Sequence, residues 1–306
     1  MEGRKPFLSV YGHVTIDQII SIGKFPVINE SVDVLDKKTT LGGTGTNIAV
    51  AAALLGTPTA LCAFIGEDFP QIYENEISES GVIMDELVRV EGYETSQATV
   101  INDLNLEQKV LFYQGPQGSA SKLGILLKDM AAQSSYVHFC TGEPEYYLSV
   151  MEAIRCDGPN VAVDPAQEIY KMWNEEKLNK TLISADFLFC NAYEAKVIER
   201  YLGIDDVLDL DLKLVVRTDG AEGSVAKLDG EMMKIPVING DVVVDATGAG
   251  DTYRAGFYTG LYNGYDIRDS LILASATSSY VVEKVGALTN IPSWDAVVKR
   301  ARKYIR

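Results

Sequence analysis

Short apolar runs recur along the first two thirds of the chain, and each ends at a glycine or at polar residues. Runs of this length without alternation are typical of strands that are buried on both faces. Helix-like spacing separates them, as in 46–56 and 69–81. Alternating strands and helices predict an α/β protein with a mostly parallel central sheet and helices on both faces. The expected strands are 7–12, 59–66, 136–140, 161–164, 186–190 and 213–217.

Two stretches depart from this rhythm. Residues 86–114 hold three segments of mixed polarity separated by polar turns, and 32–40 has a similar pattern. We expect antiparallel strands here, in a small sheet formed by about 14–40 and 86–114 that projects from a single domain over 1–306. An exposed inserted sheet usually forms a lid or a subunit contact, so a homodimer through it is expected.

The C-terminal part predicts a β-branched strand at 242–244 and then three helices, at 250–262, 267–285 and 293–304. The strand leads directly into a glycine-rich turn before the first of these helices. Helix-turn junctions of this kind are frequent binding sites for anions.

Composition narrows the class of protein. The chain has 306 residues, a hydrophobic fraction of 47% and a net charge of −16, which argues against a general nucleic-acid binder. No apolar stretch is long enough for a membrane span, and 7–11 is too short for a signal peptide. The four cysteines have no CxxC spacing, and the two histidines have no metal-ligand spacing. A cytoplasmic protein acting on small molecules is the expectation.

The candidate chemistry lies in 245–257, which reads DATGAGDTYRAGF. The turn lacks the GK[ST] of a P-loop, and Tyr253 stands where a dinucleotide fingerprint needs its third glycine. What remains is an anion site made by backbone N–H groups from about Ala249 to Asp251. A carboxylate at such a site suits a kinase, because Asp251 could accept the proton of an alcohol while the N–H groups stabilise the phosphoryl group. The helix dipole should keep Asp251 ionised. An ordinary aspartate in a first helical turn is the alternative.

Four further stretches accompany this turn in order. They are 41–56 (LGGTGTNIAVAAALLG), 63–69 (AFIGEDF), 191–194 (NAYE) and 217–224 (RTDGAEGS). Together the five resemble the motifs of the ribokinase-like, or phosphofructokinase-B, family of carbohydrate kinases, from Phe7 to about Ala287. The resemblance implies a three-layer α/β fold and ATP-dependent phosphoryl transfer, in which Asp251 is the base. The implied anion hole consists of Gly248, Ala249 and Gly250.

The resemblance also implies residues for the nucleotide. Asn191 and Glu194 would organise the water shell of Mg²⁺ on the phosphates of ATP. The same spacing is also that of a helix capping box, which is the alternative. ATP would lie along Thr218, Gly220 and Gly223, and a plain hairpin turn is the alternative there. A monovalent cation near Asp245 and 283–290 stays an open question.

The acceptor is implied by the same resemblance. Asp17 would bind two sugar hydroxyls, or else be a helix cap or a surface acid. The stretches GAGDTYRAGF, GHVTIDQI and DPAQEIY look most like archaeal nucleoside kinases within the family. The expected reaction is therefore transfer to the 5′-hydroxyl of ribonucleosides, with a free-sugar kinase or a non-catalytic sensor as alternatives. The residues expected at the acceptor are Asp17, Gly42, Gly43, Asn47, Gln97 and Phe112.

Overall fold

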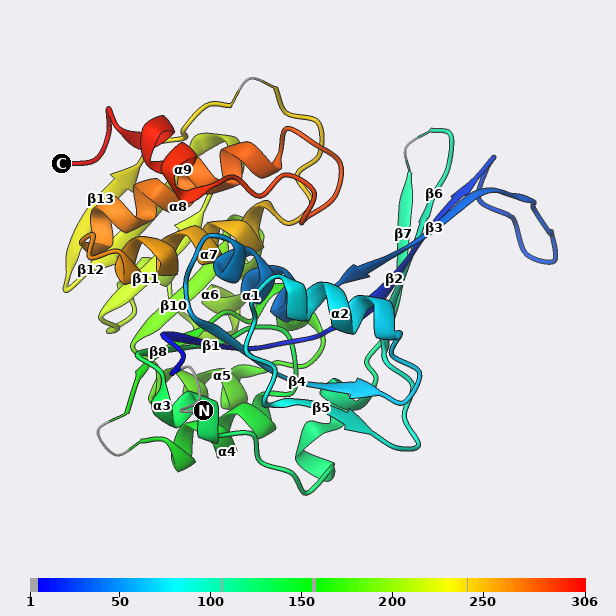
Figure 1. Ribbon diagram of the computed structural model, residues 1–306, viewed down its shortest axis with the longest axis horizontal. Coiled ribbons are helices and arrows are strands. Elements are labelled where there is room, and N and C mark those ends of the chain that lie inside the picture. Colours follow the sequence, from blue (N-terminus) through cyan, green and yellow to red (C-terminus); the bar gives the residue numbers. More distant parts are fainter. Residues whose placement is uncertain (1–4, 106, 156–157, 241) are drawn as a thin grey trace.

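The computed structural model describes residues 5–105, 107–155, 158–240 and 242–306. Its centre is a nine-stranded sheet (Figure 1). The strand order is β13-β12-β11-β10-β9-β8-β1-β4-β5. Neighbours from β5 to β11 are parallel, and β12 and β13 are antiparallel additions. The strands are β1 Leu8–Tyr11, β4 Thr59–Gly66, β5 Leu87–Val90, β8 Tyr136–Phe139, β9 Asn160–Val163, β10 Phe187–Asn191, β11 Leu214–Thr218, β12 Ser224–Leu228 and β13 Glu231–Ile235. The predicted α/β fold class is confirmed.

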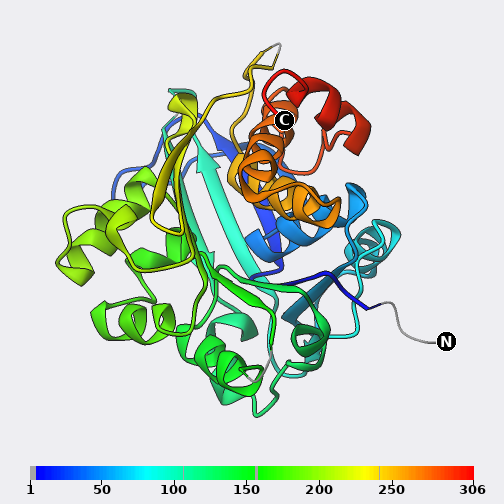
Figure 2. The same ribbon diagram turned by 90° about the vertical axis from the view of Figure 1, so that its left-hand side faces the viewer.

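Helices cover both faces of this sheet (Figure 2). Successive strand residues point to opposite faces, so Val10 joins one apolar core and Tyr11 joins the other. The first core contains α1 Thr44–Leu54, α2 Gln71–Glu79, α7 Ala249–Tyr262, α8 Ile267–Val281 and α9 Trp294–Ala301. The second core contains α3 Asp129–Gln133, α4 Pro144–Ala153, α5 Glu175–Leu182 and α6 Ala192–Leu202. Short 3₁₀ turns lie at Pro116–Lys122, Ala166–Tyr170, Val207–Asp209 and Gly220–Glu222.

A second sheet, in the order β3-β2-β6-β7, projects away from these layers (Figure 1). We call it the small sheet. Strands β2 and β6 are parallel, and the other two pairings are antiparallel. Its strands are β2 Thr15–Ile22, β3 Val34–Gly42, β6 Ser96–Asn102 and β7 Gln108–Tyr113.

Two predictions about strands were wrong. Residues 87–90 do not join the small sheet, because β5 pairs with β4 as an edge strand of the main sheet and packs Val88 and Val90 against its core. The run 242–244 is not a strand either. Val243 is 76% exposed, and Val244 N–H donates to the Val282 carbonyl at the end of a helix rather than to another strand. Mixed polarity alone cannot separate an edge strand from a projecting one.

The three C-terminal helices occur where the pattern predicts them. Helices α7 and α8 pack closely against each other, and α7 also packs against α1. This packing places the start of α7 beside the start of α1. None of the helices in the part of the chain that the structure describes is long and apolar enough to span a membrane.

Candidate active site

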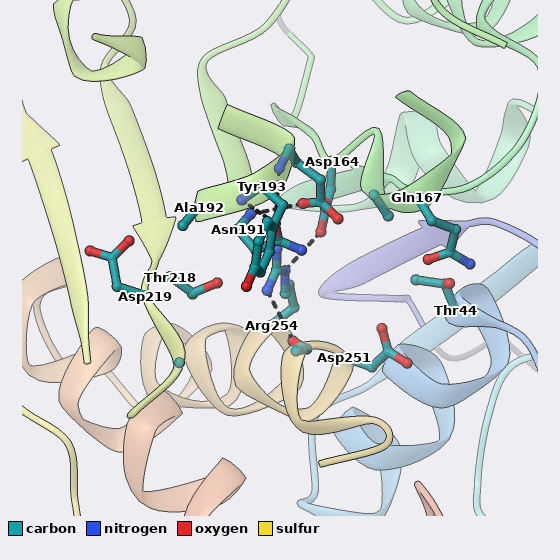
Figure 3. Close-up of a pocket in the computed structure, with 14 residues that line it drawn as sticks. Thr44, Asp164, Gln167, Asn191, Ala192, Tyr193, Thr218, Asp219, Asp251 and Arg254 are labelled. Atoms are coloured by element: carbon teal, nitrogen blue, oxygen red, sulfur yellow. Dashed lines mark hydrogen bonds and ion pairs between the residues drawn. The ribbon is translucent and has the colours of Figure 1, made fainter. Parts of the chain in front are cut away.

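A cavity of about 500 Å³ opens where the carboxyl ends of three parallel strands meet the start of α7 (Figure 3). Asp164 follows β9, Asn191 ends β10 and Thr218 ends β11, and all three line this cavity. Ligands of open α/β sheets bind beyond the carboxyl ends of the strands. The sheet therefore brings residues from distant parts of the chain to one site.

The start of α7 provides free backbone donors. Gly248 caps the helix with φ 75°, and a Cβ there would lie 2.4 Å from the Ala287 side chain, so conformation and packing both require glycine. The Ala249 N–H donates to the Ala246 carbonyl and is not free. Among the described residues, the N–H groups of Gly250 and Asp251 have no acceptor. Of the anion hole expected at Gly248, Ala249 and Gly250, only the Ala249 N–H is therefore occupied, because the Gly248 N–H also has no acceptor among the described residues.

Gly250 has a different reason to be glycine. Its φ is not positive, and a Cβ would meet only Arg254 Nη1, at 3.4 Å. Gly250 is exposed and lines the cavity. Neither backbone conformation nor packing demands glycine here, and the missing side chain leaves this wall of the cavity open.

Asp251 is paired across the two helix starts. Asn47 Nδ2 donates to Asp251 Oδ2 at 2.8 Å, which connects α1 to α7 over 204 positions of sequence. Burial raises the pKa of Asp251 to about 6, although the Asn47 hydrogen bond and the nearby Arg254 charge act in the opposite direction. The helix dipole therefore does not dominate, but the carboxylate is still mostly ionised at neutral pH. Asn47, expected to contact the acceptor, lies directly against the candidate base.

Asn191 and Glu194 form the capping box that their spacing predicts. Asn191 Oδ1 accepts from the N–H groups of Tyr193 and Glu194, each at 2.9 Å, and Glu194 Oε2 accepts from the Asn191 N–H at 2.8 Å. Burial and the neighbouring Asp164 charge raise the pKa of Glu194 to about 7. Asp164 Oδ1 is buried without a partner.

These carboxylates suit a hydrated divalent cation. Two acidic side chains that repel each other across one cavity are stabilised by a cation, and Mg²⁺ commonly keeps several waters and one or two carboxylates. Within the described ranges there is no cluster of three or more His, Cys, Asp or Glu side chains that could enclose a metal. An ion here would be held with water and phosphate oxygens by Glu194 and Asp164.

Two of the three other residues expected at ATP line the cavity. Thr218 and Gly220 do so, together with Asp219. Gly223 is not among the lining residues. It has φ 92°, and a Cβ there would lie 2.4 Å from the Ile235 carbonyl oxygen, so it serves the turn into β12.

The strand register of the small sheet decides which acceptor residues lie together. Asp17 pairs with Ala98, and Ala98 pairs with Phe112, so these side chains share one face. Gln97 pairs with Ile16 and points to the opposite face. The structure therefore places Asp17 and Phe112 on one face of the small sheet, with β6 between their strands, and Gln97 on the other face.

Gly42 and Gly43, the two glycines expected at the acceptor with Asp17, are glycine for different structural reasons. A Cβ on Gly42 would lie 2.1 Å from Asp17 Oδ2, so glycine makes room for this carboxylate. Gly43 has φ 97° and precedes α1 as its N-cap. Asp17 Oδ1 accepts from Thr15 Oγ1 at 2.5 Å, and burial raises the pKa of Asp17.

His13, a residue without an expected role, lies near this face. Its ring meets Phe112 edge-on at 5.2 Å, and both ring nitrogens are buried without a partner. Burial lowers the pKa of His13 to about 4, so the ring is neutral at physiological pH.

Sequence reasoning missed a buried ion pair at the floor of the cavity. Arg254 Nε donates to Asp164 Oδ2 at 2.7 Å, and His138 Nε2 lies 3.4 Å from the same oxygen. The available signal was that Arg254 is the one cationic residue in the sequence from 245 to 264. Its partner stands 90 positions earlier, and no local pattern indicates it.

Free amides at a helix start, a half-buried carboxylate held by an amide, and acids suited to a hydrated cation define a phosphotransferase that acts on an alcohol. Comparison with known proteins identifies the family. The sequence profile described as pfkB family carbohydrate kinase matches residues 5–294, and the chain belongs to this family. The predicted resemblance and the prediction of an ATP-dependent kinase are confirmed.

Individual relatives match over nearly their whole length. A nucleoside kinase from Methanocaldococcus jannaschii is 33% identical over 99% of both chains, and its counterpart from Methanothermobacter thermautotrophicus is 32% identical over 96% of this chain and 94% of its own. A crystal structure of the M. jannaschii nucleoside kinase superposes with a TM-score of 0.89 and covers 99% of this chain and 100% of its own, at 30% identity.

Proposed function

We propose that this kinase transfers the γ-phosphoryl group of ATP to the 5′-hydroxyl of ribonucleosides. The observation that carries the proposal is the Asn47–Asp251 hydrogen bond of 2.8 Å, beside the free N–H groups of Gly250 and Asp251. The nucleoside part is supported by Asp17 and Phe112 on one face of the small sheet and by the similarity to two archaeal nucleoside kinases.

Asp251 acts as the general base in this proposal. Asn47 occupies Oδ2 of the carboxylate, which leaves Oδ1 for the proton of the 5′-hydroxyl. The hydroxyl oxygen bonds to the γ-phosphorus while the bond from phosphorus to the bridging oxygen of ADP breaks. Fixed N–H groups at 250 and 251 then stabilise the charge on the transferring group without reorganisation.

Glu194 and Asp164 would hold Mg²⁺ through water, and Thr218 and Gly220 would lie along the nucleotide. When bound, Mg²⁺ supplies positive charge to the phosphate oxygens. A monovalent cation near 283–290 is also proposed. Asp245 there accepts from the Thr247 N–H and hydroxyl and from the Gly286 N–H, so it already connects the two loops. Titrating K⁺ against Na⁺ into the assay tests this cation.

The acceptor is proposed to lie between Asp17 and Phe112. Asp17 would bind the 2′- and 3′-hydroxyls, and the Phe112 ring would support a flat base through its apolar face. Neutral contacts of this kind accept more than one base, so purine and pyrimidine ribonucleosides should both react. A free sugar such as ribose or fructose is the second candidate, because a ribokinase from Lactococcus lactis is also similar to this chain, at 26% identity.

The deciding experiment compares kcat/KM for adenosine, inosine, cytidine, ribose and fructose under one set of conditions. The 5′-phosphate of the product is identified by NMR. A nucleoside should exceed both sugars by at least about tenfold, since the base adds buried contacts. Ribose or fructose exceeding every nucleoside overturns the acceptor assignment and leaves the kinase assignment intact.

The small sheet is proposed to serve as a lid over the acceptor and as the contact of a homodimer in a cytoplasmic enzyme. Its exposed apolar side chains support the contact, among them Leu35 at 59%, Val110 at 52% and Leu111 at 64% exposure. Small molecules, rather than nucleic acid or membranes, are the proposed partners. Light scattering at micromolar concentration tests the dimer, and a monomeric mass would refute it.

A further inference from the structure

Arg254 follows Asp251 by one turn of α7 and lines the same cavity (Figure 3). Its side chain is only 6% exposed. Among the described residues that line the cavity, it is the one cation, and the acids there are Asp164, Glu194, Asp219 and Asp251. A cavity that must accept the phosphates of ATP therefore depends on this guanidinium for its own positive charge.

The hydrogen bonds of Arg254 leave part of the guanidinium free. Nε donates to Asp164 Oδ2 at 2.7 Å, and Nη1 donates to the Gly250 carbonyl at 3.2 Å. The remaining N–H groups, including both on Nη2, have no acceptor in the described part of the chain. Nη1 also lies 3.4 Å from the position that a Gly250 Cβ would take. The guanidinium therefore borders the space that this glycine keeps open.

A purely structural role does not explain this arrangement. Burying an ion pair costs more desolvation than packing two apolar side chains, so Arg254 and Asp164 together add little stability. None of the Arg254 nitrogens is among the described buried polar atoms without a partner, so the unpaired N–H groups face the cavity that Arg254 lines. An anion that enters the cavity can accept hydrogen bonds from these groups and offset the desolvation of the ion pair. The planar donor fork of arginine matches two oxygens of a phosphoryl group.

We propose that Arg254 donates hydrogen bonds to the γ-phosphoryl group of ATP during transfer, and that Asp164 is the positioning residue that holds its donor fork. Arg254 stays protonated throughout and forms no covalent bond. It supplies within the chain the charge that some other phosphoryl-transfer enzymes receive from an arginine of a second protein. This contact belongs to the phosphoryl-donor half of the proposed reaction, so it is the same whichever acceptor is bound.

The test compares Arg254→Gln with Arg254→Lys. The lysine variant keeps a charge beside Asp164, which preserves the fold even where the glutamine variant does not fold, but it lacks the fork. Turnover should fall at least about 10³-fold in Arg254→Gln and about 10²-fold in Arg254→Lys, with the KM for the acceptor changed less than about threefold. Arg300→Lys is the matched control, because Arg300 is also ion-paired, to Glu283 at 2.9 Å, and is not among the cavity-lining residues.

A binding experiment without turnover separates this role from a structural one. Calorimetry with Mg²⁺ compares ADP with AMP-PCP, a non-hydrolysable nucleotide that carries a γ-phosphate. AMP-PCP should bind Arg254→Lys at least about tenfold more weakly than it binds the wild-type protein, while the affinity for ADP changes less than about twofold. Equal losses for both nucleotides would contradict the γ-phosphate contact, and so would a kcat within about threefold of the wild-type value.

Discussion

Replacing Gly250 with alanine tests whether this glycine serves the chemistry or the fold. The added methyl group would meet only Arg254 Nη1, at 3.4 Å, and the backbone has no positive φ at this position. Alanine in a helix is more stable than glycine by about 0.5–1 kcal/mol. The melting temperature of Gly250→Ala should therefore be unchanged or rise by about 1–3 °C.

The activity of Gly250→Ala should fall, although its stability does not. The methyl group would occupy the side of the cavity where the free N–H groups must meet phosphoryl oxygens. Misplacing a reacting group by about 1 Å costs about 10²-fold, and losing one fixed donor costs about 10²–10³-fold. We expect kcat of Gly250→Ala to fall about 10²–10³-fold, measured from the release of ADP at saturating ATP and acceptor.

Gly256→Ala is the contrasting control in the same helix. A Cβ there would lie 2.4 Å from Thr277 Oγ1, which is too close without a shift of α7 against α8. This variant should lose about 1–3 kcal/mol of unfolding free energy, whereas its folded fraction should keep kcat within about threefold. If Gly250→Ala kept more than a third of the wild-type kcat, the glycine would not border the phosphoryl site and the reasoning would be refuted.

The remaining predictions concern three charged residues, Asp251, Glu194 and Asp17. Asp251→Asn should lose about 10²–10⁴-fold in kcat while calorimetry shows unchanged ATP binding, and more than half of wild-type activity would exclude Asp251 as the base. Because burial raises the pKa of Asp251 to about 6, wild-type kcat/KM should fall with unit slope below that pH. The same raised pKa means that folding favours the protonated form, so ionisation costs wild-type stability as pH rises through about 6. Asp251→Asn should therefore melt higher than wild type at pH 8, with the gap closing by about pH 4. Glu194→Gln should raise the Mg²⁺ concentration for half-maximal rate by about tenfold, whereas a change in melting temperature alone would indicate only the capping box. Asp17→Asn should raise the KM for the nucleoside by at least about tenfold without changing the KM for ATP, and equal effects on both would place Asp17 outside the acceptor site.

The parts of the site that could be predicted from the sequence are those made by neighbouring residues. The first amides of α7 are free because no carbonyl stands four positions before them in the helix. The capping box of Asn191 and Glu194 joins residues only two or three positions apart in the sequence. A turn followed by a helix specifies such geometry wherever it stands in the fold. The buried strands were predictable for a similar reason, because a short apolar run by itself indicates a strand that is buried on both faces.

Tertiary structure decided which groups meet across the chain. Asn47 reaches Asp251 only because α1 packs on α7, and Arg254 finds Asp164 only because β9 ends beside that helix. Strand register, which shifts a side chain to the other face with every residue, separated Gln97 from Phe112. Partners between about 90 and 204 positions apart leave no periodic trace in the sequence, since their distance depends on how whole elements pack rather than on any local preference.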